Sequence, residues 1–510
     1  MVAPAAKQTR RTPRVVFIIL GIVAIICCGA PATIGAWILT GGIDTVGKVD
    51  FVNQLAIPPL APSTVNGDGE KVFDLRATTG RHTFAKDRTA DTLGYNGDYL
   101  GPTLRAAVGD KVRINVHNEI GTTTTVHWHG MHLPAMMDGG PHQPIAANTT
   151  WSPYWTIHQP ATTLWYHPHP HGETAKQVYR GLAGMFILDD PQASALALPK
   201  EYGVDDIPVI VQDKAFGGSG GLKESNSFLS GLGLLGNEIV VNGTYAPFLT
   251  ATTEQVRLRL LNGSNARTYN FGFADDRQFA IVGTDGGLLP APYRTNRVMM
   301  SPGERVEIVL AVAPRERVVL RSYPPALEGG MLNDRFSGGK DQFDVLEVRG
   351  ADSLKPSPAV PASLVPVERL DPAQATTTRT FDIGDNMINE KKMDMNRVDA
   401  TVHGGTTEVW NVRNLDGAPH NFHIHGVDFQ VLSIAGAEPP PELRGWKDTV
   451  FTRSGKVIRL LVRFGDETDP QHPFMLHCHV LFHEDQGMMA QFVVVAPGQQ
   501  ANLAPTGHHP

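Results

Sequence analysis

The chain of 510 residues contains only three cysteines. Cys27 and Cys28 lie in an apolar stretch near the N-terminus, which leaves Cys478 as the single cysteine of the remaining chain. A framework of disulfides within the globular part is therefore excluded. Charge is also modest, with 19% charged residues and a formal net charge of -7. Because no strongly basic face is implied, nucleic acid is not expected as a partner.

Helix signals are scarce as well, whereas turn-forming residues are plentiful, with 52 Gly and 38 Pro. Apolar and polar residues alternate, as in half-buried strands, over Lys111–Val116, Arg305–Val312 and Val457–Phe464. These features predict an all-β fold of Greek-key barrels or sandwiches. The chain is too long for one ordinary hydrophobic core, so we expect roughly two to four domains.

The N-terminus has the pattern of a targeting or anchoring element. Residues 15–43 are uncharged and follow four basic residues, Lys7, Arg10, Arg11 and Arg14. This stretch exceeds the about 20 apolar residues that span a bilayer, and the basic flank would remain in the cytoplasm. Ala30-Pro31-Ala32 has the form of a cleavage site, but the apolar run continues to Leu39 and favours an uncleaved anchor. Residues 1–44 are expected to form a transmembrane anchor or signal helix, with the rest of the chain extracytoplasmic.

One short pattern occurs three times. The segments VRINVHN, VRLRLLN and EVWNVRN end at Asn118, Asn262 and Asn414, which are 144 and 152 residues apart (262−118 and 414−262). Such spacings suit a domain, so the repeat predicts three similar β domains. We expect them at residues 51–191, 200–350 and 379–496. Residues 351–378, rich in Pro, Ala and Ser, are expected to form a linker, and residues 497–510 a disordered tail.

The residues nine positions after each repeated Asn distinguish the three copies. His127-Trp128-His129 follows Asn118, and His423-Ile424-His425 follows Asn414. At the same offset after Asn262 the chain has Phe271-Gly272-Phe273. The sequence therefore predicts metal in the first and third domains and none in the second.

Four His-x-His pairs are present in all. Each pair would place two imidazoles on one face of a strand. Eight imidazoles suit a cluster of three ions, bound by three, three and two ligands, but imidazole alone does not identify the metal. The pairs are His127/His129, His167/His169, His423/His425 and His477/His479.

Cys478 does identify a metal. Two histidines, one cysteine and a distant methionine are the ligand set of a blue copper site, which His420, Cys478, His483 and Met488 supply. In a strand, Cys478 would face one way and the flanking His477 and His479 the other. One strand would then contact two separate metal centres and join them covalently.

The histidine segments resemble the four copper motifs of multicopper oxidases, in particular the three-domain bacterial laccases and cuprous oxidases. They are HWHG (127–130), HPH (167–169), HNFHIHG (420–426) and HCHVLFHEDQGM (477–488). The similarity extends through DGGPHQP (138–144), LNGSNARTYNFGF (261–273) and GWKDTV (445–450), and covers roughly residues 55 to 496. It implies three cupredoxin-like Greek-key barrel domains, of which the middle one binds no copper.

The resemblance also implies four coppers per chain and a role for each motif residue. His420, Cys478, His483 and Met488 match the type 1 ligands, and His127 and His423 the type 2 ligands. The type 3 pair is matched by six residues: His129, His167, His169, His425, His477 and His479. The implied reaction is one-electron oxidation of phenols, aromatic amines or Cu(I), coupled to four-electron reduction of dioxygen to water.

Three carboxylates are further candidates. Asp138 and Glu484 match acidic positions of the family and could supply protons to oxygen reduction, although solvated loop carboxylates are the simpler interpretation. Asp416, four residues before His420, could hydrogen-bond that imidazole and help admit the donor, or be an ordinary turn residue.

Other functions remain as alternatives. A copper-free cupredoxin relative with a structural or division-associated role would have lost ligands that this chain keeps. A nitrite reductase would lack the type 3 pair. A dedicated role in copper efflux, by oxidation of Cu(I), is left open by the sequence.

Overall fold

A computed structural model describes residues 41–226 and 231–503 of the chain. The expected anchor or signal helix lies outside the described residues, apart from its last four positions. So does the end of the expected tail, from residue 504. The described helices include none that is long and apolar enough to cross a membrane. Ile43, at the end of the uncharged stretch, donates its backbone N–H to Asp341 Oδ1 at 2.8 Å.

The first third of the chain forms two sheets. One contains β2 (Ser63–Val65), β3 (Lys71–Ala85), β4 (Arg88–Tyr95), β6 (Lys111–Glu119), β8 (Thr150–Trp151) and β9 (Tyr154–Thr156). The other has the order β5 (Leu104–Ala107), β11 (Gly184–Asp189), β10 (Thr162–His167) and β7 (His127–His129). The short outer strand β7 carries the first His-x-His pair.

The middle third also forms two sheets. The larger has the order β14 (Thr244–Tyr245), β13 (Glu238–Val241), β12 (Asp206–Lys214), β16 (Gln255–Asn262), β21 (Arg305–Ala311), β18 (Phe279–Thr284) and β19 (Gly287–Thr295). The other has the order β1 (Asn53–Gln54), β15 (Pro247–Thr253), β23 (Phe343–Lys355), β22 (Arg317–Ser322), β17 (Tyr269–Phe273) and β20 (Val298–Met300). The N-terminal strand β1 thus pairs with β15 of the middle third.

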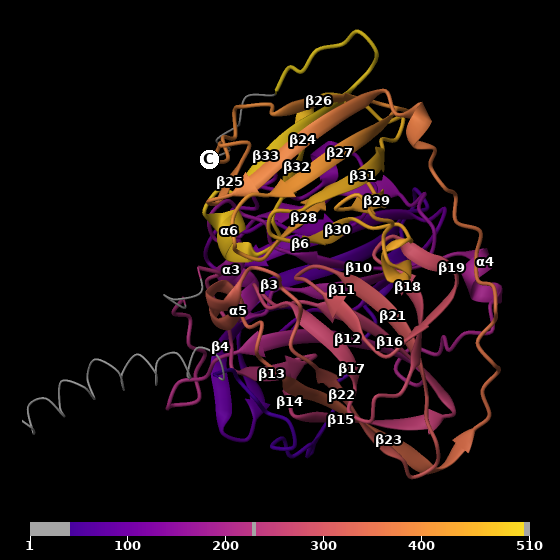
Figure 1. Cartoon of the computed structure of the whole chain (residues 1–510). Helices are drawn as coiled ribbons and strands as arrows, with labels where there is room; N and C mark the ends of the chain where they lie inside the picture. The colour runs from indigo at the N-terminus through magenta and orange to yellow at the C-terminus, as the bar shows by residue number, and fades with distance from the viewer. Residues whose placement is uncertain (1–40, 227–230, 504–510) are drawn as a thin grey trace, which may run out of the picture.

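The last third repeats this plan. One sheet has the order β25 (Met387–Ile388), β24 (Thr377–Gly384), β27 (Thr407–Asn414), β31 (Val457–Arg463) and β29 (Phe429–Ile434). Its companion has the order β26 (Ala400–His403), β33 (Met489–Val495), β32 (Asp469–His477), β28 (His420–Ile424) and β30 (Thr449–Thr452). Figure 1 shows these sheets above those of the middle third, with the chain after β23 running along the right edge to join them.

The described residues form few helices, and these are short. They are α3 (Thr174–Arg180), α4 (Pro191–Ala195), α5 (Met331–Phe336) and α6 (Leu481–Asp485), with the 3-10 turns η2 (Ala135–Met137), η3 (Pro372–Gln374) and η4 (Pro441–Leu443). The prediction of a mostly β chain is confirmed. The three alternating runs singled out in the sequence form β6, β21 and β31, except that Val312 and Phe464 directly follow their strands.

The threefold repeat has a structural counterpart. Its segments form β6, β16 and β27, and each of these strands pairs with a parallel strand on one side and an antiparallel strand on the other. Each repeated Asn side chain donates to two backbone carbonyls, those of Thr122 and Ile145, of Arg267 and Met300, and of Ala418 and Thr452. A short carboxamide thus closes the turn after the strand in all three copies.

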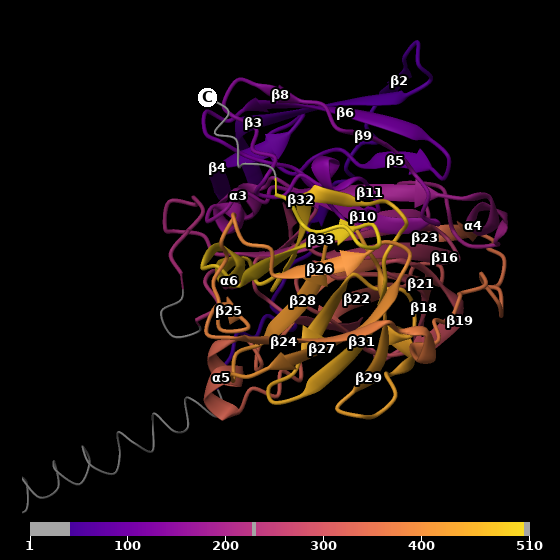
Figure 2. The ribbon, with the colours of Figure 1, turned by 90° about the horizontal axis from the view of Figure 1, so that it is seen from above.

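The three thirds of the chain do not each have a separate apolar core. The middle third has its own core, in which Phe271 and Phe273 of β17 are fully buried. The first and last thirds share one apolar cluster, which contains Trp128 and Met137 from one and Phe474 and Cys478 from the other. The His-x-His segments of these two thirds therefore face a common interface. Seen from above in Figure 2, the first third lies in the upper part of the picture and the last third in the lower part.

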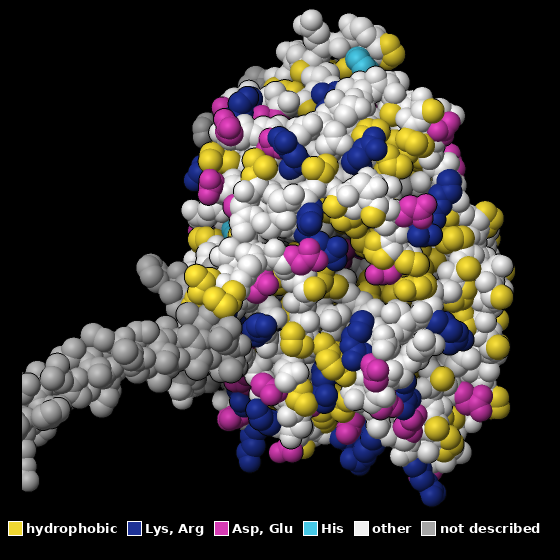
Figure 3. Space-filling model, viewed as in Figure 1, with side chains coloured by type: hydrophobic (Ala, Val, Ile, Leu, Met, Phe, Trp, Pro, Cys, Tyr) yellow, Lys and Arg dark blue, Asp and Glu magenta, His cyan; other side chains and the backbone are white. Residues whose placement is uncertain are grey.

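Charges of both signs share the surface. On the face in Figure 3, Lys and Arg side chains are interspersed with Asp and Glu. Apolar side chains stand among them in small groups. Val65, Val52 and Leu415 are the most exposed large apolar side chains of the described residues.

Candidate metal centre

Strand pairing brings the histidine pairs together. In the first third, β7 and β10 are antiparallel, and His127 lies opposite His167. In the last third, β28 and β32 place His423 opposite His477. The shared core then packs the two sheets against each other, and all eight imidazoles are buried, with at most 1% exposed. Residues about 300 positions apart thereby become direct neighbours.

The ring nitrogens form three groups of three, within each of which the nitrogens lie within 4.8 Å of one another. In the group His169, His425 and His477, the Nε2 atom of His477 lies 3.1 Å from that of His169 and 3.0 Å from that of His425. In the group His129, His167 and His479, the Nε2 atoms of His167 and His479 are 3.4 Å apart. His127 and His423 form the third group together with His129.

Backbone carbonyls fix which nitrogen points inward. The Nδ1 atom of His127 donates to the carbonyl of Asp138 at 3.0 Å, and that of His477 donates to the carbonyl of Cys478 at 3.1 Å. His167 donates to Pro168 in the same way, at 2.8 Å. Because a carbonyl only accepts, Nδ1 carries the hydrogen and Nε2 presents a lone pair to the site.

These convergent lone pairs fit a bound cation. Burial lowers the pKa of His477 to about 3 and holds the pKa of His169 and His425 well below the ordinary range, so the rings are neutral. The Nε2 atoms of His127 and His423 are buried and have no hydrogen-bond partner among the described residues. Buried polar atoms are normally paired, and neutral imidazole is a ligand for copper, zinc, iron or nickel.

Two of the predicted carboxylates lie inside this centre. Asp138 Oδ2 accepts from His425 Nδ1 at 2.8 Å and has 2% exposed side chain. Glu484 of α6 lies between two imidazoles, with Oε1 3.3 Å from His169 Nδ1 and Oε2 3.3 Å from His477 Nδ1. Burial raises the pKa of Glu484 well above its usual range. The simpler interpretation of both as solvated loop carboxylates is therefore wrong.

A separate group surrounds Cys478, whose side chain is fully buried. Its Sγ atom lies 3.6 Å from His420 Nδ1 and 3.7 Å from His483 Nδ1. Burial opposes ionisation of the thiol, but the two imidazoles outweigh it and lower its pKa to about 6. Met488 is also fully buried, and its carbonyl accepts from the backbone N–H of Cys478 at 3.2 Å. A thiolate beside two imidazoles is a soft ligand set that suits copper.

Asp416 lies on the outer side of this group. Its Oδ1 atom accepts from His420 Nε2 at 3.0 Å, so Nδ1 of that ring is left facing Cys478. Asp416 also accepts from the backbone N–H groups of Ala418 and Asp385, and its side chain is 28% exposed. Asp416 therefore both stabilises the local turn through backbone N–H groups and makes the predicted hydrogen bond with His420.

The expectation that each His-x-His pair lies within one strand is right only for His127/His129. β10 ends at His167, β28 ends at Ile424 and β32 ends at His477, so the second histidine of the other pairs follows the strand. The side chains of residues 477–479 nevertheless point to different metal-ligand groups, as expected. Cys478 faces His420 and His483, whereas His477 and His479 join two different imidazole groups. Asn421 Oδ1 fixes this turn by accepting from the backbone N–H of His479 at 2.6 Å.

The sequence did not single out one acidic contact. Asp448 is fully buried, and its Oδ1 atom lies 3.0 Å from His129 Nε2. Arg305 from the middle third forms an ion pair with it. Asp448 belongs to the segment GWKDTV, which entered the analysis only as part of the resemblance, and no spacing relates it to a histidine.

Two buried copper-type ligand groups joined by adjacent residues, on a frame of paired β-sheets, are characteristic of blue multicopper proteins. Family models described as multicopper oxidase match residues 76–193, 205–318 and 362–498, together more than half of the chain. The chain belongs to the multicopper oxidase family and has its cupredoxin-like fold.

Relatives in this family carry different names. Multicopper oxidase mco of Staphylococcus haemolyticus is 36% identical over 449 residues, which are 87% of this chain and 92% of the relative. Cell division protein FtsP of Escherichia coli is 36% identical over 448 residues, 86% of this chain and 92% of the relative. The solved laccase-like multi-copper oxidase CueO of Ochrobactrum sp. is 35% identical, with a TM-score of 0.78 over 86% of this chain and 100% of that one.

Proposed function

We propose that the protein binds four coppers and oxidises a small reducing substrate with dioxygen as the electron acceptor. The type 1 copper would be held by His420, Cys478, His483 and Met488. His127 and His423 would hold the type 2 copper. The type 3 pair would be held by the groups His129/His167/His479 and His169/His425/His477. The observation that carries the proposal is that six of the eight imidazoles form two separate groups of three, while His127 and His423 form a third group that shares His129.

Bound copper would supply one-electron oxidation at the Cys478 site and four-electron reduction of dioxygen to two waters at the histidine cluster. The chain itself supplies the connection between them. Cys478 is covalently continuous with His477 and His479, which lie in the two imidazole groups of three. Electrons accepted at Cys478 would therefore reach both groups through one short stretch of backbone and side chain.

Oxygen reduction consumes four protons along with four electrons, and two buried carboxylates are placed to deliver them. Glu484 lies against His169 and His477, and burial favours its protonated form. Asp138 accepts from His425 on another side of the cluster. We assign both the role of general acids, Glu484 as the group that holds a proton at neutral pH and Asp138 as the one that also orients an imidazole.

The electron donor is proposed to approach the Cys478 site past Asp416. This carboxylate is partly exposed and accepts from the buried ligand His420. Leu415 beside it is 61% exposed and offers an apolar contact. A phenol or aromatic amine would suit this pair, with its O–H or N–H donated to the carboxylate, and Cu(I) would suit the carboxylate alone.

A second function is favoured by one observation. Relatives named cell division protein FtsP are as similar to this chain as those named multicopper oxidase. A division-associated role without copper would need no ligands, yet every proposed ligand is present here and the imidazoles are buried. We therefore place the oxidase first.

Copper analysis with spectroscopy separates these functions. The oxidase is expected to hold four coppers per chain, with a blue thiolate band and a near-ultraviolet type 3 shoulder. Oxygen uptake with Cu(I), a phenol and bilirubin as alternative donors would identify the substrate class. One copper or none in protein prepared with excess copper would refute the oxidase and favour the structural role.

We further propose three domains, at residues 51–191, 200–350 and 379–496, one for each pair of sheets, and an extracytoplasmic location with residues 1–44 as anchor or signal. The location rests on the basic flank and the uncharged stretch of the sequence. Fractionation of cells that express the whole chain, compared with a chain lacking residues 1–44, tests it. Equal export of the two would contradict it.

A further inference from the structure

All three thirds of the chain meet at the carboxylate of Asp448, which directly precedes β30. Its Oδ1 atom lies 3.0 Å from His129 Nε2 of β7. Arg305 of β21 donates to the same carboxylate through two nitrogens, Nη1 to Oδ1 at 2.8 Å and Nη2 to Oδ2 at 2.5 Å. Asp448 and Arg305 are both fully buried. A group so deeply buried and so tightly held has a geometry that the surrounding protein dictates.

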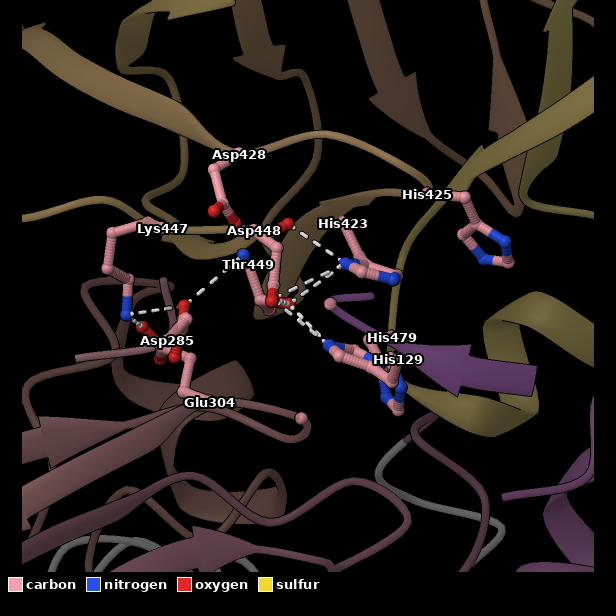
Figure 4. Close-up of polar contacts among 12 residues, drawn as sticks. His129, Asp285, Glu304, His423, His425, Asp428, Lys447, Asp448, Thr449 and His479 are labelled. Carbon is pink, nitrogen blue, oxygen red and sulfur yellow. Dashed lines mark hydrogen bonds and ion pairs between the residues drawn. The ribbon is translucent and has the colours of Figure 1, made fainter. Parts of the chain in front are cut away.

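Asp448 contacts two stacked imidazoles, that of His129 through its carboxylate and that of His423 through its backbone carbonyl (Figure 4). The rings of His129 and His423 are parallel within 6°, with centroids 3.7 Å apart. Because a carboxylate only accepts, His129 carries its hydrogen on Nε2, and its Nδ1 atom has no partner among the described residues. His423 donates from Nδ1 to the backbone carbonyl of Asp448 at 2.9 Å, which leaves Nε2 free. One residue thus selects both tautomers.

The middle third fixes the plane of this carboxylate. The two parallel bonds from Arg305 prevent the carboxylate from rotating, since a guanidinium is a rigid fork. Arg305 is itself held by its Nε bond to the Thr163 carbonyl at 2.9 Å and by its backbone N–H bond to Asp285 Oδ1 at 2.7 Å. Lys447 balances the charge of Asp285 at 2.9 Å and also reaches Glu304 at 2.7 Å.

The same part of the middle third packs against the imidazoles themselves. Gly303 precedes β21, and a Cβ atom there would lie 3.1 Å from the ring of His479 and 3.2 Å from Cε1 of His129. Its φ of 85° is in the left-handed region that favours glycine. The metal-free third therefore forms one wall of the metal centre.

We propose that the carboxylate of Asp448 is a positioning group that selects the copper-binding nitrogen of His129, beside the backbone carbonyl that does so for His423, and that Arg305 is the middle third's contribution to this selection. The inference rests on the proposed copper function and gives the third without copper a role in it. Loss of a group that orients a metal-bound histidine typically weakens metal binding about 10- to 100-fold.

The test is the Asp448→Asn variant of the whole chain, loaded with Cu(II) and dialysed against a chelator. It is expected to lose copper about 10- to 100-fold more readily than the wild type. Its type 3 shoulder should weaken, because the side-chain partner of His129 is changed, while the blue band of the Cys478 site remains. A general loss of stability would weaken the blue band as well, so it would not produce this difference between the two sites.

Asp206→Asn is the matched control. Asp206 is also fully buried, accepts two bonds from Arg259 at 2.6 and 2.9 Å, and has Glu307 as a second acid near the same arginine. None of its described contacts is with a histidine of the centre. This variant should lose thermal stability but keep its copper and both spectroscopic signals.

Several outcomes would overturn the inference. Wild-type copper retention in Asp448→Asn would do so, as would equal copper loss in Asp448→Asn and Asp206→Asn. If Asp448→Asn does not fold, Asp448→Glu decides, because it keeps the charge opposite Arg305 but displaces the carboxylate; full copper content in it would refute positioning. A wild type that binds no copper would instead refute the proposed function, and this inference with it.

Discussion

The Nε2 atoms of His169 and His477 lie 3.1 Å apart, although 308 positions separate the two residues in the chain. The Nε2 atom of His425 lies 3.0 Å from the same atom of His477. His477 donates from Nδ1 to the Cys478 carbonyl and His425 donates from Nδ1 to Asp138 Oδ2, so neither of these two Nε2 atoms carries a hydrogen. Two lone pairs 3.0 Å apart repel each other unless a cation lies between them, so this contact is a sign of a bound metal.

Replacing Cys478 by serine tests the connection between the two ligand groups. Cys478→Ser removes the soft thiolate but little volume, so the fold and the histidine cluster should persist. The variant is expected to hold one copper fewer than the wild type, to lose the blue band, and to stop consuming oxygen with any donor. Unchanged oxygen consumption would contradict the route through residues 477–479.

Glu484→Gln tests proton delivery. The amide keeps the size of the side chain but has no acidic proton, and a general acid typically contributes about 100-fold or more to rate. Turnover should fall by about that factor while copper content and the reduction of the blue site by donor stay unchanged.

The neighbouring Asp485 is the control for that variant. It accepts from the backbone N–H groups of Thr174 and Ala175 at 2.9 and 3.0 Å, so it holds α3 against α6. Asp485→Asn should cost stability and leave the rate intact. A rate loss equal to that of Glu484→Gln would assign the effect to α6 as a whole.

Asp138→Ala tests the second carboxylate. The substitution leaves His425 Nδ1 without its partner at 2.8 Å, and a ring freed in this way typically binds metal about 10- to 100-fold more weakly. Copper content after dialysis should fall, and oxygen uptake with it. Met136→Ala, two positions away and 46% exposed, should change neither.

The repeated asparagines are expected to act on stability alone. Asn262→Ala leaves the buried carbonyls of Arg267 and Met300 without their donor, which should cost about 1 to 3 kcal/mol of unfolding free energy. Denaturant unfolding measures this cost. Because Asn262 belongs to the third without His-x-His pairs, copper content should be unchanged. A loss of copper would show that the middle third couples to the centre more widely than through Arg305 and Gly303.

Lys214 predicts a dependence of stability on pH. Burial lowers its pKa from 10.5 to about 7, so the unfolded chain binds a proton more readily than the folded chain between these values. Its contribution to stability is therefore least favourable below pH 7 and improves as the pH rises toward 10. Lys214→Met removes this effect, and its stability relative to the wild type should fall with rising pH by at most about 1.4 kcal/mol per unit. A difference independent of pH would contradict it.

The sequence by itself determined the ligand chemistry. The four His-x-His pairs, the constant offset from Asn118 and Asn414, and Cys478 between two histidines all depend on neighbours within about ten residues, where chain geometry is local. β6, β16 and β27 could be predicted for the same reason, since their patterns are local in the chain. So could the replacement of histidine by Phe271 and Phe273 in the middle copy.

Only the tertiary structure decided which imidazoles share a group, that Asp138 and Glu484 are buried against them, and that Asp448 and Arg305 support His129. Each of these contacts joins residues whose separation is set by sheet pairing and by the core shared between the first and last thirds. Local periodicity predicts which face of a strand a side chain lies on. It does not predict which distant strand that side chain contacts, because this depends on how whole sheets pack. β10 ends directly before Pro168, which has no N–H to donate, so the sequence itself marks that boundary. β28 and β32 also end before their second histidines, and no proline precedes those positions.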